Sequence, residues 1–286
     1  MLIVLKLKAT ALGAAVAAPF LAASLTPSAP LSLDGAVSIP AASFSYRVAG
    51  DFSRGGKPVV APLHGIHLSH DLAIMKTQVT AAAYAQCVAD GACPRVAMPT
   101  GSLNVPIVGV SWHDATAYAV WISRKTGIPH RLPTDEEWTF AAAEKARDET
   151  LPLVDPANPA QAWIARYEAE ASRDRPAVAK PQPVGSFGIN SQGVADIAGN
   201  VWEWTNTCFL RVSLDGGAER VTNTNCGVRV VQGAHRAYMT DFVRDPRAGG
   251  CAAGVPPANL GFRLVVENRW SAVALLERVM NSLYRG

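Results

Sequence analysis

The 286-residue chain has no excess of charge of either sign. Its 26 lysines and arginines stand against 23 aspartates and glutamates, which gives a formal net charge of +3, and the basic residues are scattered. A nucleic-acid-binding surface needs clustered Lys and Arg side chains that neutralise phosphates. The composition therefore argues against nucleic acid as a partner.

Long hydrophobic runs are also missing, except near the N-terminus. There, two lysines precede an uncharged, alanine-rich stretch at residues 9–25, which is typical of a signal peptide. This stretch is short and weakly apolar beside the ~20 strongly apolar residues that a membrane-spanning helix needs. We expect residues 1–30 to be a signal peptide cleaved after Ala17 or Ala23, and the protein to be periplasmic or otherwise secreted, without a stable membrane span. An uncleaved anchor is the alternative.

No Gly/Ser-rich or Pro-rich linker of useful length divides the rest of the chain. About 260 residues are enough to bury a large core in one domain. We expect this domain at residues 38–266, followed by an amphipathic helix at residues 267–286 whose apolar residues recur on one side. The helix is expected to pack back on the domain, and a membrane or partner face is the alternative.

Cysteine is scarce, with five in the chain. Disulfides persist in oxidising compartments, so export changes how these residues are interpreted. Cys87 and Cys93 bracket a short loop, and Cys208 and Cys226 bracket a polar segment. We expect the disulfides Cys87–Cys93 and Cys208–Cys226, which leaves Cys251 as either a buried or a reactive thiol.

Start and stop signals predict three helices and several short strands. Helices are expected to begin at Thr80, Ser111 and Thr134, and the last two have an acidic residue three positions later, as in a capping box. Gly91 and Gly127 should end the first two. Short β segments are expected at 107–110, 228–232 and 261–266, between turns rich in Gly, Asn and Pro. The pattern indicates an α+β fold.

Residues 199–204, Gly-Asn-Val-Trp-Glu-Trp, place Glu203 between two tryptophans. A carboxylate in an aromatic wall loses water and needs a cation or several hydrogen-bond donors in compensation. Ligation of calcium by this carboxylate and nearby backbone carbonyls would satisfy it. A buried glutamate bonded to backbone amides would satisfy it equally well.

Five motifs resemble those of the sulfatase-modifying factor family, and they lie at residues 106–112, 131–138, 183–187, 199–204 and 259–263. This family includes the formylglycine-generating enzymes, the C-terminal domain of the ergothioneine sulfoxide synthases and the pyoverdine-maturation oxidase. The resemblance covers residues 38–266. It implies the formylglycine-generating-enzyme fold, which is a loop-rich variation of the C-type lectin fold around a surface groove.

The matching sequence lacks the family's sulfur chemistry. In formylglycine-generating enzymes, two cysteines five residues apart bind copper as thiolates; the resemblance places these positions at Ala237 and Phe242, after Ala234 in place of a serine. Neither an alanine methyl nor a phenyl ring holds a cuprous ion. Formylglycine generation is therefore not expected, and a relocated chemistry at Cys251 is the alternative.

The same resemblance raises the question of an iron site. The ergothioneine enzymes hold iron with three histidines of a separate helical domain, which has no counterpart here. His64, His67 and His70 could bind iron, copper or zinc if a loop gathered them, but in a strand His67 would point away from the other two. A copper or iron site therefore stays open.

The resemblance also implies site residues. A structural calcium site would use four residues: Ala198, Gly199, Val201 and Glu203. Candidates for proton transfer, or for a hydrogen-bonded rim that recognises a polar ligand, are His235, Arg236, Tyr238 and Asp241. The expected lining of the substrate groove is Trp204, Asn259 and Arg247.

Two functions follow from these expectations. The first is an exported accessory or maturation factor, or a non-formylglycine oxidase of the non-haem metal type, that acts on a periplasmic client protein or a small metabolite. Residues 225–242 look closer to accessory members associated with copper nitrite reductase in denitrification than to the formylglycine-generating enzymes. The second is a non-catalytic module that binds a peptide or small ligand in the lectin-like groove.

Overall fold

The computed structural model describes residues 35–147, 180–245 and 259–267, all within one compact unit, Leu33–Gly286. The expected signal peptide, the expected C-terminal amphipathic helix, Arg247 and Cys251 lie outside the described residues. Within the described ranges, no helix is both long and apolar enough to span a bilayer.

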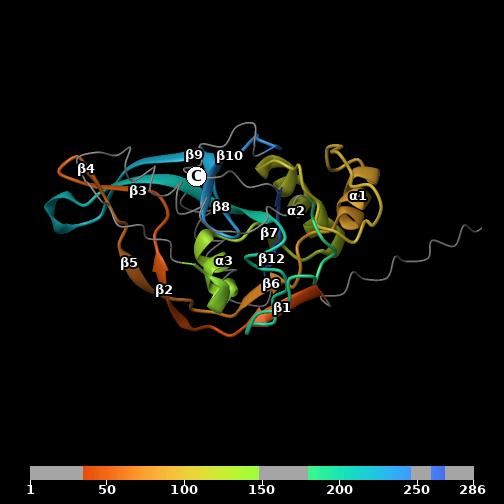
Figure 1. The fold of residues 1–286 in the computed structure, drawn as a ribbon, viewed down its shortest axis with the longest axis horizontal. Coiled ribbons are helices and arrows are strands. Elements are labelled where there is room, and N and C mark those ends of the chain that lie inside the picture. Colours follow the sequence, from red (N-terminus) through yellow and green to blue (C-terminus); the bar gives the residue numbers. More distant parts are fainter. Residues whose placement is uncertain (1–34, 148–179, 246–258, 268–286) are drawn as a thin grey trace, which may run out of the picture. The chain divides into compact units, whose positions relative to one another are not determined.

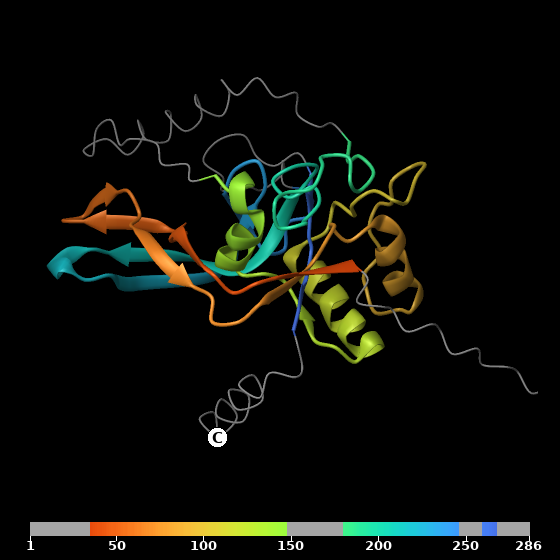
Figure 2. The same ribbon diagram turned by 90° about the horizontal axis from the view of Figure 1, so that it is seen from below.

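The largest sheet has six strands in the order β10-β9-β8-β3-β4, with β11 beside β8 (Figure 1). Their bounds are β3 Asp51–Arg54, β4 Lys57–Val59, β8 Trp202–Ser213, β9 Arg220–Gln232, β10 Ala237–Thr240 and β11 Leu260–Gly261. Strands β8 and β9 form a long antiparallel hairpin. Figure 2 shows this hairpin reaching away from helices α1 (Ala81–Ala89) and α2 (Trp112–Thr126).

Two smaller sheets complete the fold. One has the order β1-β6-β12-β7, and the other pairs β2 with β5. Their bounds are β1 Ala36–Ile39, β2 Ser43–Arg47, β5 Leu63–His67, β6 Leu72–Met75, β7 His130–Arg131 and β12 Val265–Val266. The mixture of few helices and curled sheets confirms the predicted α+β class.

All three predicted helices are present, and local capping explains where each begins. The side chain of Thr80 accepts from the backbone of the first turn of α1. Ser111 opens α2 and Thr134 opens α3 (Asp135–Ala142), each in a complete capping box. Such caps satisfy the amide groups that a helix start leaves unpaired. Gly127 ends α2 with φ 71°, a left-handed conformation that suits glycine.

The strand predictions are only partly confirmed. Residues 228–232 are the end of the longer strand β9, as expected. Residues 261–266 divide into β11 and β12. The expected strand at residues 107–110 is wrong, because Gly109 adopts φ 70° and interrupts any extended run. Ile107 is nevertheless fully buried and donates its amide to Val79.

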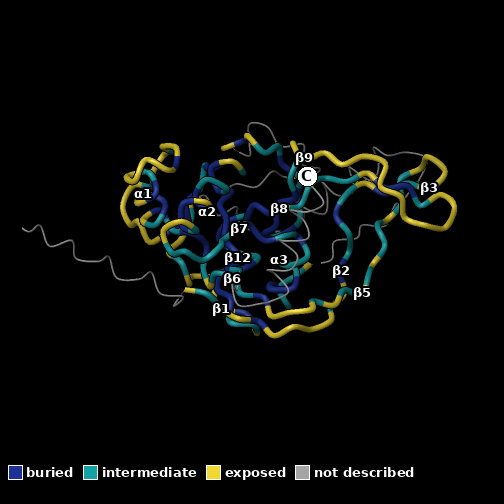
Figure 3. The backbone as a smooth tube through the Cα atoms, turned by 180° about the vertical axis from the view of Figure 1, so that it is seen from behind, coloured by how far each residue is buried: buried dark blue, intermediate teal, exposed yellow. Residues whose placement is uncertain are grey.

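The buried residues form two apolar clusters, one under α1 and α2 and the other under α3. Figure 3 shows the buried backbone concentrated where β6, β12, β8 and α2 meet, whereas the far end of the long hairpin is largely exposed. The second cluster includes Trp138 of α3 and Ile74 of β6.

A fully buried ion pair, Glu203–Arg263, lies in this interior. Its two side chains are 0% exposed and contact each other twice, with Nε 2.6 Å from Oε2 and Nη2 2.7 Å from Oε1. Gln78 and Trp138 donate to the same carboxylate at 2.8 and 2.9 Å. The sequence indicated that a buried Glu203 needs a cation or several hydrogen-bond donors. The cation is the side chain of Arg263, 60 residues further along the chain.

Arg263 is satisfied on its other side by backbone carbonyls. Its Nη1 donates to Met75 and Lys76 at 3.2 and 3.1 Å, and its Nη2 donates to Ala195 at 3.1 Å. The guanidinium therefore joins β6, the loop before β8 and the segment that leads into β12. A buried ion pair is tolerated only when its remaining hydrogen bonds are made in this way.

We predict that Arg263→Met destabilises the fold by about 3–5 kcal/mol, because it leaves Glu203 as an uncompensated buried charge. The double variant Glu203→Leu/Arg263→Met should lose less than the single variant. Urea unfolding followed by tryptophan fluorescence would measure both. Arg211→Met, at an exposed position of β8, is the control and should change stability by less than about 0.5 kcal/mol. A loss below about 1 kcal/mol for Arg263→Met would contradict the central role of the pair.

A second ion pair links β7 to the start of α3. Arg131 contacts both carboxylate oxygens of Glu137 at 2.6 Å, and the amide of Thr134 donates to the same carboxylate at 2.8 Å. Burial alone would raise the pKa of Glu137, but the hydrogen bonds and charge of Arg131 outweigh it and lower the pKa below its usual value.

This lowered pKa predicts an acid-dependent loss of stability. The ionised form of Glu137 is favoured in the folded state, so its contribution is complete above the unfolded pKa of about 4.3 and is lost as the pH falls through the folded pKa. Glu137→Gln should remove that part of the pH dependence. The free energy of unfolding, measured from about pH 6 to about pH 3, should fall less steeply for the variant; parallel curves would contradict the assignment.

Candidate functional site

The expected groove floor is the short strand β10 with the loop before it. Ala237 and Met239 are buried, whereas Tyr238 and Thr240 are half-buried on the opposite side of the strand. Of the four predicted proton-transfer residues only Tyr238 lies in β10, because His235 and Arg236 precede the strand and Asp241 follows it. The structure does not bring all four together, and each contacts a different set of partners.

His235 is buried against an indole. It is 5% exposed, and its ring meets that of Trp202 edge-on at 5.3 Å. Trp202 donates from Nε1 to the backbone carbonyl of His235 at 3.1 Å. Gly233 makes this packing feasible, because a Cβ at this position would lie only 2.6 Å from the Trp202 ring. His235 is thus held as part of the packing around Trp202.

Arg236 belongs to a network around Asp135, the first residue of α3. Asp135 is 0% exposed and accepts from Tyr46 at 2.6 Å, from Arg236 at 2.9 Å and from Gln232. The guanidinium also lies over the Tyr46 ring, 5.5 Å from its centroid. Burial, and then the charge of Asp135, raise the pKa of Tyr46 far above its usual range. This phenol therefore acts as a hydrogen-bond donor.

Tyr238 lies near this network but contacts other groups. Its hydroxyl accepts from the Gly50 amide at 2.8 Å, and its ring meets Phe209 edge-on at 5.1 Å. Burial raises the pKa of this phenol, while the charge of Arg236 opposes the shift. Tyr238 is thereby held between the residue before β3 and Phe209 of β8.

Asp241 contacts the N-terminal turn of α2. Its carboxylate is 3.3 Å from His113 Nε2, and its backbone oxygen accepts from the Trp112 amide at 2.9 Å. The neighbouring Arg229 lies 4.0 Å from the centroid of the Trp112 ring. The turn after β10 and helix α2 are therefore joined by a side-chain contact and a backbone hydrogen bond.

The two positions that carry thiols in formylglycine-generating enzymes differ sharply in exposure. Ala237 is 3% exposed within β10, whereas Phe242, in the turn after the strand, is 72% exposed. A buried methyl and an exposed phenyl ring provide no ligand for a cuprous ion. Copper does not fit these two residues.

The groove-lining predictions have mixed outcomes. The prediction for Trp204 is wrong, because its side chain is 0% exposed and donates from Nε1 to the Val110 carbonyl at 2.9 Å inside the core. Asn259 is half-buried, and its carbonyl accepts from the Trp202 amide at 2.9 Å. Trp202 is half-buried, and its ring meets that of His235.

The contacts of Glu203 do not fit the predicted calcium ligand. Arg263, Gln78 and Trp138 already donate to both carboxylate oxygens, and Arg263 supplies the compensating charge. A calcium ion at this carboxylate would have to displace those donors.

The other predicted calcium ligands are backbone carbonyls of a turn with unusual geometry. Ala198 has φ 60°, and the carbonyl of Gly199 accepts from the Val201 amide at 2.7 Å. Within the described ranges, no group of three or more His, Cys, Asp and Glu side chains is placed to hold a metal ion. Calcium stays a prediction for this turn.

The three clustered histidines have separate partners. His64 pairs with Glu219 at 2.7 Å, His67 with Ser43 at 3.1 Å, and His70 with Ser69 at 3.0 Å. Strand β5 ends at His67, so the predicted two-residue alternation does not extend to His70. The geometry does not favour a shared metal site.

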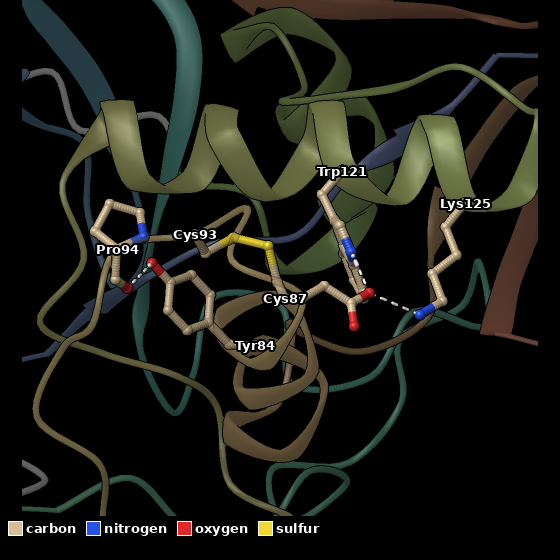
Figure 4. The surroundings of a disulfide bond; sticks show 7 residues. Tyr84, Cys87, Cys93, Pro94, Trp121 and Lys125 are labelled. Carbon is tan, nitrogen blue, oxygen red and sulfur yellow. Dashed lines mark hydrogen bonds and ion pairs between the residues drawn. A yellow bond between two sulfur atoms is a disulfide. The ribbon is translucent and has the colours of Figure 1, made fainter.

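Both predicted disulfides are confirmed, and their settings differ. Cys87–Cys93 closes the end of α1 beneath α2 (Figure 4). Beside it, Asp90 accepts from Trp121 Nε1 at 2.9 Å and pairs with Lys125 at 2.8 Å. Cys208–Cys226 joins β8 to β9. Two disulfides are typical of a protein of an oxidising compartment.

An open depression of about 390 Å³ lies over the same face of α2. Its lining consists of Ala92, His113, Thr116, Ala117, Val120, Trp121 and Arg124. Its lining includes His113, which contacts Asp241.

The sequence alone did not single out several residues that the structure shows to have many contacts. Asp135 lies inside a capping motif, and the cap accounts for Thr134 and Glu137 but leaves Asp135 without a role. That unexplained carboxylate was the available signal. No local pattern pointed to Arg229 or Tyr46, because their partners are distant in the chain.

The chain is similar to proteins of one family. The family model for the sulfatase-modifying factor enzyme 1-like domain matches residues 22–268. The inactive C-alpha-formylglycine-generating enzyme 2 of Bos taurus is 31% identical over 172 residues, covering 55% of this chain and 54% of its own. The formylglycine-generating enzyme of Streptomyces coelicolor is 30% identical over 177 residues, covering 57% and 53%. The chain thus spans about half the length of the curated relatives it matches.

A solved structure supports the same fold. PvdO from Pseudomonas aeruginosa aligns with a TM-score of 0.52 at 23% identity, over 82% of this chain and 94% of that one. This likeness shows the formylglycine-generating-enzyme-like fold alone. Together with the family model, which matches most of the sequence, it leads to one conclusion: the chain belongs to the sulfatase-modifying factor family.

Proposed function

We propose that this protein is an exported accessory or maturation factor, which binds a segment of a periplasmic client protein and does not generate formylglycine. The observation that carries the proposal is the exchange of the family's thiol positions for Ala237 and Phe242, with Phe242 72% exposed. The scaffold is retained, while the groups that would bind copper are replaced.

The surroundings of Phe242 suit a peptide. A large exposed aromatic side chain is a favourable anchor for a partner. Next to it in sequence, Asp241 pairs with His113, and across the β9–β10 pair Arg229 lies over Trp112. Apolar, anionic and cationic groups are thereby offered on neighbouring elements, as in the polar rim around an interface anchor.

The relatives support this choice in two ways. One of them is named an inactive formylglycine-generating enzyme, so a relative with this domain is named as lacking that activity. The resemblance of residues 225–242 to accessory proteins associated with copper nitrite reductase makes such a reductase the first client to test. A structural calcium ion on the carbonyls of Ala198, Gly199 and Val201 is part of the proposal, and it would stabilise the fold by binding only the folded chain.

We predict that the purified protein, supplied with copper and oxygen, leaves unchanged a cysteine peptide that the Streptomyces coelicolor enzyme converts, because Ala237 and Phe242 offer no thiolate. Mass spectrometry of the peptide would read the result, with the Streptomyces enzyme as positive control. Elemental analysis of the same preparation would show calcium if the structural ion is present. Conversion of the peptide by this protein would overturn the proposal.

We also predict that the protein binds a copper nitrite reductase through Phe242. Phe242→Ala should weaken this binding at least about tenfold, as expected for an interface anchor. Biolayer interferometry would measure both affinities. Ile189→Ala removes a side chain that is 57% exposed on a different segment, so it is the matched control and should bind as the unaltered protein does.

The outcomes separate client from anchor. Equal binding by the Phe242→Ala variant would show that Phe242 is not the anchor. No binding by the unaltered protein would exclude the reductase as client.

A further inference from the structure

The disulfide Cys208–Cys226 has an accessible sulfur, unlike its counterpart. Cys87 and Cys93 are 0% and 7% exposed, under Trp121 and α2. Cys226 is exposed and Cys208 is half-buried. The β8–β9 pairing shifts register on both sides of Cys208, so the bond sits at an irregular part of the hairpin. An external thiol can approach the sulfur of Cys226, whereas the other disulfide is enclosed.

A cation lies against the other sulfur of this bond. Nη1 of Arg229 is 3.1 Å from Cys208 Sγ and also donates to the Asn206 carbonyl at 2.9 Å. The guanidinium lies over the Trp112 ring at 4.0 Å. Disulfide sulfur is a weak acceptor, but a thiolate at the same place would accept a charge-assisted hydrogen bond.

Arg229 is also poorly compensated. Its Nε is buried and has no hydrogen-bond partner within the described part of the chain. Burial lowers the pKa of Arg229, and only the more distant charge of Asp241 opposes the shift; Asp241 itself is paired with His113. A half-buried cation of this kind gains from a new anion next to it. Reduction of Cys208 would supply that anion.

We infer that Cys208–Cys226 is a redox-active disulfide that exchanges with an external dithiol, with Arg229 stabilising Cys208 as the leaving thiolate. One thiolate of the dithiol attacks Sγ of Cys226, the bond between the two protein sulfurs breaks, and its electron pair stays on Cys208. The second thiol of the dithiol then attacks the mixed disulfide and releases Cys226, which takes up a proton. The dithiol is oxidised to a disulfide, and the protein disulfide is reduced to two cysteines.

The chemistry of each sulfur fits its place in this exchange. Attack depends on access, which favours the exposed Cys226, and departure is faster for a thiol whose thiolate is stabilised, which favours Cys208 beside Arg229. The β-ladder keeps the two strands together after the bond opens. Arg229 is paired with Cys208 on one side and with Met239 of β10 on the other. Cys208 and Cys226 therefore lie on β8 and β9, and β9 pairs with β10, where Ala237 stands at one of the family's two thiol positions.

The full-length protein should be equilibrated in dithiothreitol buffers of graded potential, alkylated and analysed by mass spectrometry. Cys208–Cys226 is expected to be reduced while Cys87–Cys93 remains intact. Arg229→Gln should lower the equilibrium constant for this reduction about tenfold, which corresponds to about 30 mV for a two-electron couple. Arg211 is an exposed arginine on β8, the strand that carries Cys208, and Arg211→Gln should leave this equilibrium constant unchanged.

A second measurement does not depend on the disulfide. In Cys226→Ser the unpaired Cys208, followed separately from Cys251 through the mass of its own peptide, should alkylate with a pKa below the usual value of about 8.5. Adding Arg229→Gln should return this pKa towards that value. A pKa at or above that value would overturn the inference, as would simultaneous reduction of both disulfides. Neither result bears on Phe242 or on client binding, so the proposed function would stand or fall separately.

Discussion

The charge of a single buried carboxylate constrains how the chain comes together. The Glu203 side chain on β8 is 0% exposed, and the arginine that compensates its charge lies in the segment between β11 and β12. If the same guanidinium turned to another partner, carbonyls of β6 and of the loop before β8 would be left without their hydrogen-bond donor. Because such groups are costly to bury alone, the sheets, α3 and the C-terminal strands are coupled at this point.

This coupling is independent of the chemistry at the surface. Strand β10 and the turn after it carry Ala237 and Phe242 where formylglycine-generating enzymes carry thiols, yet the strand pairs with β9 and the turn contacts α2. The hydrogen-bonded carboxylate Asp135 orders Tyr46 and Arg236 beneath the same strand. The scaffold can thus keep its geometry while the reactive groups change, which is why family membership alone does not establish an activity.

Local signals predicted what local physics decides. Caps at Thr80, Ser111 and Thr134 marked the helices, because the groups involved are three residues apart. The short spacing of Cys87 and Cys93 likewise indicated their bond. The partners of Glu203 and Asp135 are far away in sequence, so the need for compensation was foreseeable but the partner was not. The groove assignment of Trp204 failed for the same reason: exposure depends on what the rest of the chain places above a side chain.

The absence of a side chain at Gly233 also affects its neighbours. The Trp202 indole lies directly on the backbone of Gly233, in space that a Cβ would occupy, and His235 packs on the ring. Enlarging residue 233 would lift the indole and disturb the histidine with it. Positions 202 and 233 should consequently change together, with tryptophan at 202 opposite glycine and a smaller side chain at 202 opposite alanine. The two residues found in a homologous protein would then indicate how closely its side chain 202 packs on the backbone at 233.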